Sequence, residues 1–248
     1  SQNLELVDRS LVNSIYNIDR DVALQFRHSF HLGGLLIREA ASISGGEGRN
    51  YSVDNAGGYD YTGRIEILPF GKFTKKGDYF QGDLYHEKTP KLAIGATVDH
   101  NVDAAQSRGQ LGSELGFNRS LSSIMLDLIF KYQGFSVMSE FIRKDTKDPF
   151  GTKEKALDNT ITGTFVTGNG FNAQVGYTTK KHWSLVGRFS NITPDKATFL
   201  PEQNQYTLGL SKYIVNHKFK VQTDASYNTY YGTQANAFMW RFQVEVGI

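Results

Sequence analysis

Alternation of apolar and polar side chains is the feature of this sequence that most restricts its fold. The last eleven residues read FMWRFQVEVGI, in which Phe238, Trp240 and Phe242 alternate with Met239 and Arg241. Successive side chains of a β-strand point to opposite faces, so this segment is predicted to be a strand with one apolar and one mainly polar face. A soluble sandwich buries such an apolar face, whereas a membrane barrel turns it outward to lipid.

Eleven segments of the chain are predicted to be strands, and none shows a convincing helical period. Most run ten to thirteen residues, against about five or six for an average strand. A high aromatic content of 13% and only 5 prolines suit long strands. No linker divides them, so residues 1–248 are predicted to form a single domain. The segments are 21–32, 34–44, 59–70, 90–101, 121–133, 135–145, 170–179, 182–191, 205–215, 218–229 and 237–248.

The joints between these segments alternate in length. Very short joints occur near Gly33, near Gly134, at Lys180–Lys181 and at Asn216–His217. Long joints lie between them, at 45–58, 102–120, 146–169 and 192–204. Short turns at one end and long loops at the other are typical of an outer-membrane β-barrel. The joint at 71–89 breaks the rule, because it is long but falls at the end of the short turns.

The order of strands leads to a further expectation. If the last strand ends in the periplasm, the strand at 21–32 runs inward and residues 1–20 belong to an extracellular loop. Bacterial barrels start in the periplasm and have an even number of strands. We therefore expect an odd number of strands before Ser1: either this chain is the C-terminal part of a barrel, or the count of eleven strands is off by one.

Four blocks of the sequence resemble the phosphate-selective porin O/P family, in particular the versions found in Bacteroidetes-type bacteria. The resemblance implies a transmembrane, antiparallel, up-and-down β-barrel of sixteen strands in the bacterial outer membrane, commonly a homotrimer. Family members carry N-terminal strands before a block like the first of these, so five further strands would complete the eleven. The blocks are VDRSLVNSIYNIDRDVAL (7–24), YTGRIEILPFG (61–71), EKTPKLAIGATVDHN (87–101) with RGQ (108–110), and FNAQVGYTTKKHWSLVGRFS (171–190).

Charged side chains on the polar face are the candidates for lining a channel. The basic ones outnumber the acidic ones by ten to six, which predicts a mild preference for anions. Arginine suits phosphate through its planar donor fork, but phosphate selectivity itself is implied only by the resemblance. The alternative is that these charges pair across strands and stiffen the wall. The basic candidates are Arg27, Arg38, Arg64, Lys91, Lys131, Lys144, Arg188, Lys218, Lys220 and Arg241, and the acidic ones are Glu66, Asp99, Asp127, Glu140, Asp224 and Glu245.

Other kinds of site have little support in the sequence. The chain has no cysteine, and His28 and His31 fall on opposite faces of one strand, so no metal site or other cofactor is expected. The segment GGEGRN (45–50) lacks the strand–helix setting of a phosphate-binding loop and is predicted to be a flexible surface loop. No nucleophile motif indicates an enzyme. A net charge of +2 with scattered basic residues gives no indication of nucleic-acid binding.

Three functions remain open from the sequence. The first is a passive channel in the outer-membrane lipid bilayer for small anionic or polar solutes. The second is a barrel scaffold whose long loops at 102–120 and 146–169 bind a partner protein of the cell envelope. The third is a soluble secreted β-sandwich, such as an adhesin. The length of the strands, the asymmetry of the joints and the mixed charges on the polar face favour the first.

Overall fold

The computed structural model describes residues 3–49, 58–152, 161–198, 200–232 and 235–247. In this part of the chain eleven strands form one antiparallel sheet, ordered as in the sequence, and β7 and β8 form a separate two-stranded hairpin. The sheet strands are β1 (Ala23–Leu32), β2 (Leu35–Ser44), β3 (Asp60–Leu68), β4 (Lys91–Gln106), β5 (Glu114–Tyr132), β6 (Phe135–Asp145), β9 (Gly168–Thr178), β10 (Trp183–Pro194), β11 (Gln203–Val215), β12 (Phe219–Tyr230) and β13 (Ala237–Val246). The predicted all-β, up-and-down antiparallel class and its eleven strands are confirmed.

The structure differs from the predicted elements in its long joints. β4 and β5 continue past the predicted ends, so the loop predicted at 102–120 shrinks to residues 107–113. Register shifts after Asn101 and Ala104 allow this extension, because the extra residues, one in β4 and then three in β5, are absorbed without ending the pairing. The hairpin β7 (Phe150–Thr152) and β8 (Ile161–Thr164) lies in the loop predicted at 146–169, of which residues 153–160 lie outside the described part.

Three short helical segments also occur. They are α1 (Leu11–Tyr16), η1 (Thr74–Tyr79) and η2 (Lys196–Thr198). Each is too short to show a helical period in the sequence. Ser10 caps α1 by accepting a hydrogen bond from the backbone N–H of Asn13 at 3.0 Å. No helix among the described residues is long and apolar enough to cross a membrane.

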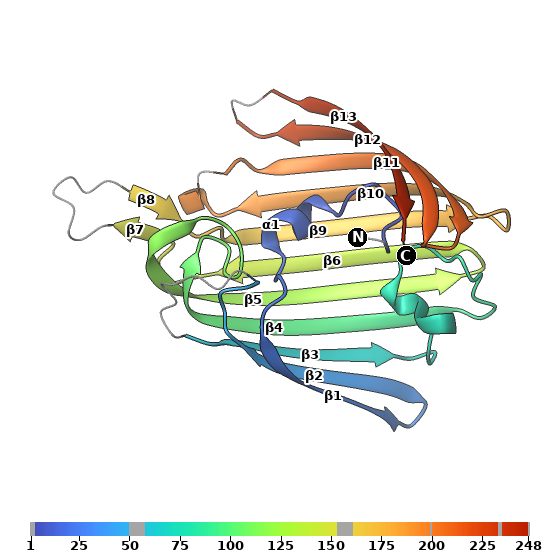
Figure 1. The fold of residues 1–248 in the computed structure, drawn as a ribbon, viewed down its shortest axis with the longest axis horizontal. Coiled ribbons are helices and arrows are strands. Elements are labelled where there is room, and N and C mark those ends of the chain that lie inside the picture. Colours follow the sequence, from blue (N-terminus) through green and yellow to red (C-terminus); the bar gives the residue numbers. More distant parts are fainter. Residues whose placement is uncertain (1–2, 50–57, 153–160, 199, 233–234, 248) are drawn as a thin grey trace.

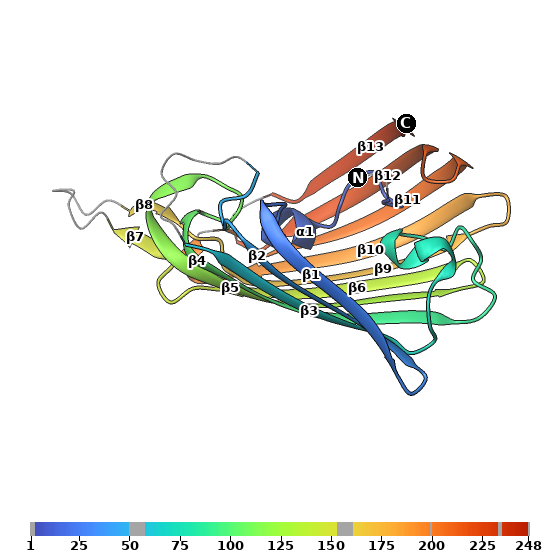
Figure 2. The same cartoon turned by 60° about the horizontal axis from the view of Figure 1, so that its bottom comes forward.

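The sheet is a curved trough, and the N-terminal segment with α1 lies in its hollow (Figures 1 and 2). We call the side that carries this segment the inner face and the opposite side the outer face. Among the described strands, β1 pairs only with β2, and β13 only with β12, so the sheet is open at both edges.

The outer face is apolar and exposed, whereas the inner face is largely polar and buried. In β13, Phe238, Trp240 and Phe242 are exposed on the outer face, while Arg241 pairs with Asp224 on the inner face. The same separation of apolar and polar side chains onto opposite faces runs along the sheet, as the alternation predicts, although the inner-face side chains of the edge strand β1 are exposed. Exposed outer-face side chains include Leu24, Phe26, Ile65, Ile94, Val98, Ile124, Leu126, Phe171, Val175, Leu185, Leu208, Val244 and Val246.

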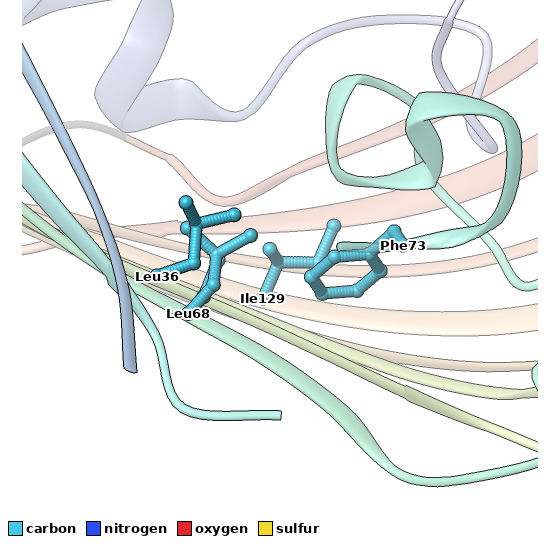
Figure 3. Close-up of a cluster of buried hydrophobic side chains, with 5 residues drawn as sticks. Leu36, Leu68, Phe73 and Ile129 are labelled. Atoms are coloured by element: carbon cyan, nitrogen blue, oxygen red, sulfur yellow. The ribbon is translucent and has the colours of Figure 1, made fainter. Parts of the chain in front are cut away.

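Small apolar clusters fix inward-folded segments to the inner face. In one, Phe73 of the 71–89 segment covers Leu36, Leu68 and Ile129 of the sheet (Figure 3). In another, Val12 and Tyr16 of α1 pack against Ile142 and Ile192. Among the described residues, the buried apolar side chains thus gather in small separate clusters.

Gly170 in β9 is the position that admits α1. A Cβ atom there would lie 2.7 Å from Val12 Cγ1 and 3.1 Å from Tyr16 Cδ2. Gly170→Val should therefore overpack the contact, cost about 1–3 kcal/mol and detach α1 from the sheet.

Hydrogen exchange of the amides of Leu11–Tyr16 measures this detachment. In the matched control, Gly187→Ala in the neighbouring strand β10, the added Cβ would meet no atom within 4 Å, so exchange in α1 should stay at the wild-type rate. Unchanged protection of α1 in Gly170→Val would contradict the packing described.

Candidate functional site

The N-terminal segment, residues 3–22, is anchored to the inner face by Glu5. Ser184 Oγ donates to Glu5 Oε1 at 2.8 Å, and Gln174 Nε2 donates to Glu5 Oε2 at 3.0 Å. The backbone carbonyl of Glu5 accepts from Ser211 Oγ at 2.6 Å and from Gln222 Nε2 at 2.8 Å. One buried residue of the segment is thus bonded to four strands, β9, β10, β11 and β12.

Glycines on either side make room for this carboxylate. A Cβ at Gly176 would lie 2.9 Å from Glu5 Oε1, and one at Gly82 would lie 2.6 Å from the same atom. Burial raises the pKa of the Glu5 carboxyl above its ordinary value, and the hydrogen bonds from Ser184 and Gln174 offset part of this rise.

Basic side chains of the sheet hold the next residues of the segment. Lys220 Nζ donates to the Leu4 carbonyl at 2.6 Å, and Arg188 Nη1 donates to the Asp8 carbonyl at 2.8 Å. Arg241 Nη1 lies 3.4 Å from Asp8 Oδ2. Three cations that were candidates for lining a channel therefore bind a segment of the same chain.

The 71–89 segment, which broke the alternation of joint lengths, also folds onto the inner face. Lys131 Nζ donates to the carbonyls of Gly77 at 2.7 Å and Phe80 at 2.8 Å, and to that of Gly82. Gly134 N–H donates to Asp83 Oδ2 at 2.8 Å. The buried amine of Lys131 is therefore bonded to three carbonyls of this segment.

The two inward segments are bonded to one another. The amide oxygen of Gln81 accepts from Glu5 N–H at 2.9 Å, and Gln81 N–H donates to the Asn3 carbonyl at 2.9 Å. Asn3 Nδ2 donates to the Tyr79 carbonyl at 3.1 Å. Together they form a continuous layer over part of the sheet.

A polar cavity of about 900 Å³ remains between this layer and the sheet. Five arginines and five carboxylates are among its described lining residues, so its formal charge is balanced. The charged residues are Arg9, Arg27, Arg38, Arg64, Arg188, Glu39, Glu66, Asp78, Asp127 and Glu140.

An ion-pair ladder crosses the cavity wall from β2 to β5. Arg38 Nη1 lies 2.9 Å from Glu66 Oε2, and Arg64 Nη2 lies 3.1 Å from Glu66 Oε1. Arg64 Nη2 also donates to Asp127 Oδ1 at 2.8 Å, and Arg38 pairs with Asp78 of the 71–89 segment. Opposite charges therefore lie next to each other along the wall, which lowers the net electrostatic field in the cavity.

The ten basic candidates fall into three groups. Arg27, Arg38, Arg64 and Arg188 line the cavity. Lys131, Lys144 and Lys220 are buried and donate to backbone carbonyls, and Arg241 pairs with Asp224. Lys91 and Lys218 lie at the end of the short turns, outside the cavity lining, where Lys91 Nζ donates to the Phe70 carbonyl at 2.7 Å.

Several residues of the site were missed by the strand-based reading of the sequence. Arg9, Asp78, Tyr79 and Gln81 line the cavity from segments predicted to be loops. The signal that could have found three of them was the long joint at 71–89, since a loop at the end of the short turns has room to fold inward.

No protein-family model, curated protein or solved structure matches this chain. The resemblance to the phosphate-selective porin family therefore stays a prediction.

The raised pKa of Glu5 makes the stability of the inner layer depend on pH. As the pH rises past the unfolded-state pKa of about 4.3, the unfolded chain loses its proton first, so the free energy of unfolding should fall until the pH passes the folded-state pKa. Glu5→Gln places an amide that does not titrate in the same pocket and should remove this fall.

Equilibrium unfolding of the detergent-solubilised protein across this pH range compares the two chains. Glu39→Gln, which changes an exposed carboxyl of β2, serves as the matched control and should retain the wild-type slope. An identical slope in wild type and Glu5→Gln would show that the Glu5 carboxyl is not the group responsible.

Proposed function

We propose that this chain forms the wall of an outer-membrane porin through which small polar solutes diffuse passively. The observation that carries the proposal is the inverted burial of the sheet. Large apolar side chains such as Val98, Leu208 and Trp240 are exposed on the outer face, while Lys131, Gln174 and Lys220 are buried on the inner face. An outward apolar face with a polar interior is the arrangement that a lipid bilayer requires of a barrel.

The open edges of β1 and β13 support the barrel form of this proposal. An edge strand leaves a row of unpaired backbone N–H and C=O groups, which are costly in the hydrocarbon core of a bilayer. Further strands between the two edges would pair these groups and close the wall. A β-sandwich instead needs two facing sheets, whereas the described residues form one sheet and a small hairpin.

The inward-folded segments support a narrow rather than an open pore. Residues 3–22 and 71–89 cover part of the inner face, and the cavity beside them is lined by side chains of β1–β6, β9 and β10. The balanced charge of its lining supports diffusion of small polar solutes with little preference for either sign. A mild anion preference was predicted from ten basic and six acidic side chains, but most of these basic groups are paired or buried in the wall.

Arg27 offers a test of the pathway, because it lines the cavity and its guanidinium bonds to the neutral side chain of Gln25 at 2.8 Å. In planar bilayers the full-length protein should form an ohmic channel. Arg27→Glu should shift its reversal potential toward cation selectivity, since the cavity lining then carries two more units of negative charge.

Lys91→Glu provides the control for this measurement, because Lys91 lies outside the cavity lining. It makes the same charge change and should leave the reversal potential near that of wild type. Absence of any ohmic conductance from the full-length protein would refute the porin proposal.

Leu208 tests the contact with lipid. It lies in the middle of β11 with its side chain 61% exposed on the outer face. Leu208→Arg should destabilise the bilayer-inserted protein by about 2–4 kcal/mol, because a charge near the bilayer midplane is poorly solvated.

The loss of folded protein is measured by gel electrophoresis after folding into lipid vesicles. A smaller fraction of the chain should show the change of mobility on heating that marks a folded barrel. Leu200→Arg makes the same exchange outside the strands and should fold as wild type does. If Leu208→Arg also folds like wild type, the outer face does not meet lipid at this position.

A further inference from the structure

Polar side chains meet on the inner face at the end of the sheet that carries the long loops. Asp60, the first residue of β3, is paired in register with Asn101 of β4 and Ser44 of β2, and all three are buried. Asp99 is paired in register with Thr62, the next inner-face residue of β3, and Thr62 Oγ1 donates to Asp99 Oδ1 at 3.0 Å. Two acidic side chains and an amide are thereby brought together beneath the loop that follows β2.

The GGEG segment, residues 45–48, is folded down onto this group. Gly46 N–H donates to the carboxylate of Asp21, and the Gly46 carbonyl accepts from Asn101 Nδ2 at 2.8 Å. The backbone of Gly46 has a φ of +84°, and a Cβ there would lie 2.8 Å from Asn101 Oδ1. The prediction of a flexible surface loop is wrong for residues 46–48, which are buried, because their backbone is bonded to the end of the sheet.

Within the described part of the chain, three side-chain oxygens of this group lack a hydrogen-bond partner. They are Asp60 Oδ1, Asn101 Oδ1 and Glu47 Oε2, and their residues are respectively 1%, 2% and 4% exposed. Most buried oxygens in folded proteins accept a hydrogen bond or bind an ion. Asn101 carries no charge, so its unpartnered oxygen is an observation separate from the acidic side chains. The amide nitrogen of the same side chain donates to the Gly46 carbonyl.

The charge of the group is also unbalanced. Asp60 and Asp99 act on one another and Asp21 acts on both Asp60 and Glu47, so four carboxylates share this region. The cation that acts on Asp60 and Asp99 is Lys144, whose Nζ donates to the Arg108 carbonyl at 2.9 Å. This one amine acts on two of the four carboxylates, those of Asp60 and Asp99, whereas buried charges are ordinarily paired or bound to metal.

We propose that Asp60, Asp99 and Asn101 bind one Ca²⁺ ion, with Glu47 and Asp21 facing it from the loop side. Carboxylate and amide oxygens are the ligands that Ca²⁺ prefers, and its flexible coordination of six to eight oxygens leaves places for backbone carbonyls or water. Among the described residues, no three acidic, histidine or cysteine side chains are arranged as a metal site by themselves. The proposed site is a mixed one, in which the ligands of the ion are the carboxylates of Asp60 and Asp99 and the unpartnered amide oxygen of Asn101.

Such an ion would bind the loop after β2 to the ends of β3 and β4. It would therefore order the loop end of the sheet and leave the cavity residues unchanged. This inference does not rest on the porin proposal, because ion binding and conductance are measured separately.

Equilibrium dialysis of the full-length, detergent-solubilised protein against Ca²⁺ at constant ionic strength tests the site. Wild type should bind one Ca²⁺ per chain at about 1 mM, and Mg²⁺ at the same concentration should not displace it. Asp60→Asn and Asn101→Ala should each weaken binding about tenfold or more. Asp103→Asn removes an exposed carboxylate at the same end of the sheet and should bind as wild type does.

A second measurement needs no variant. Addition of Ca²⁺ to wild type should slow hydrogen exchange of the amides at residues 45–48, and Mg²⁺ or added NaCl should not. The proposal is overturned if wild type binds no Ca²⁺, as expected if the Asp60–Asp99 pair shares a proton instead. It is equally overturned if Asp60→Asn retains wild-type affinity, or if exchange at 45–48 is indifferent to Ca²⁺.

Discussion

The structure depends on hydrogen-bond and ion-pair partners for the polar side chains that are buried on the inner face of the sheet. A sheet that turns its apolar side chains outward leaves amides, hydroxyls and charges on the inside, and each needs a partner once it is removed from water. Glu5 and Lys131 show how this is achieved. Glu5 supplies acceptors to side chains of four strands, and Lys131 finds three carbonyl acceptors in the 71–89 segment. The inward segments are thus held mainly by hydrogen bonds, with the small apolar clusters around Phe73 and Val12 adding local packing.

The need to pair buried polar groups also changes the role assigned to the charged residues of the polar face. A lysine on the polar face of a strand looks, in the sequence, like a group exposed to a water-filled channel. In the structure Lys220 is fully buried between Glu245, at 3.2 Å, and the Leu4 carbonyl. Its role is to hold the N-terminal segment, and the charged side chains that line the cavity come from β1, β2, β3, β5, β6 and β10 and from the two inward segments.

The strands could be predicted from sequence because their signal is local. Period-2 alternation depends on neighbouring residues alone, and the short turns at Gly33 and Gly134 fix where strands reverse. The cavity could not be predicted in this way. Its shape depends on where residues 3–22 and 71–89 pack, and those contacts join positions far apart in the chain, such as Gln81 with Glu5. The burial of GGEG was missed for the same reason, since Asn101 lies 55 residues from Gly46.

The anchoring of the N-terminal segment has a consequence for the order of folding. Val7 N–H donates to Asp224 Oδ2, and these residues are 217 positions apart. The loop-closure entropy of so distant a contact can be recovered only after the strands between them have paired. Residues near the start of the chain therefore find their acceptors and donors only when β12 is in place. Docking of this segment is therefore expected to be a late kinetic event that follows pairing of the sheet strands.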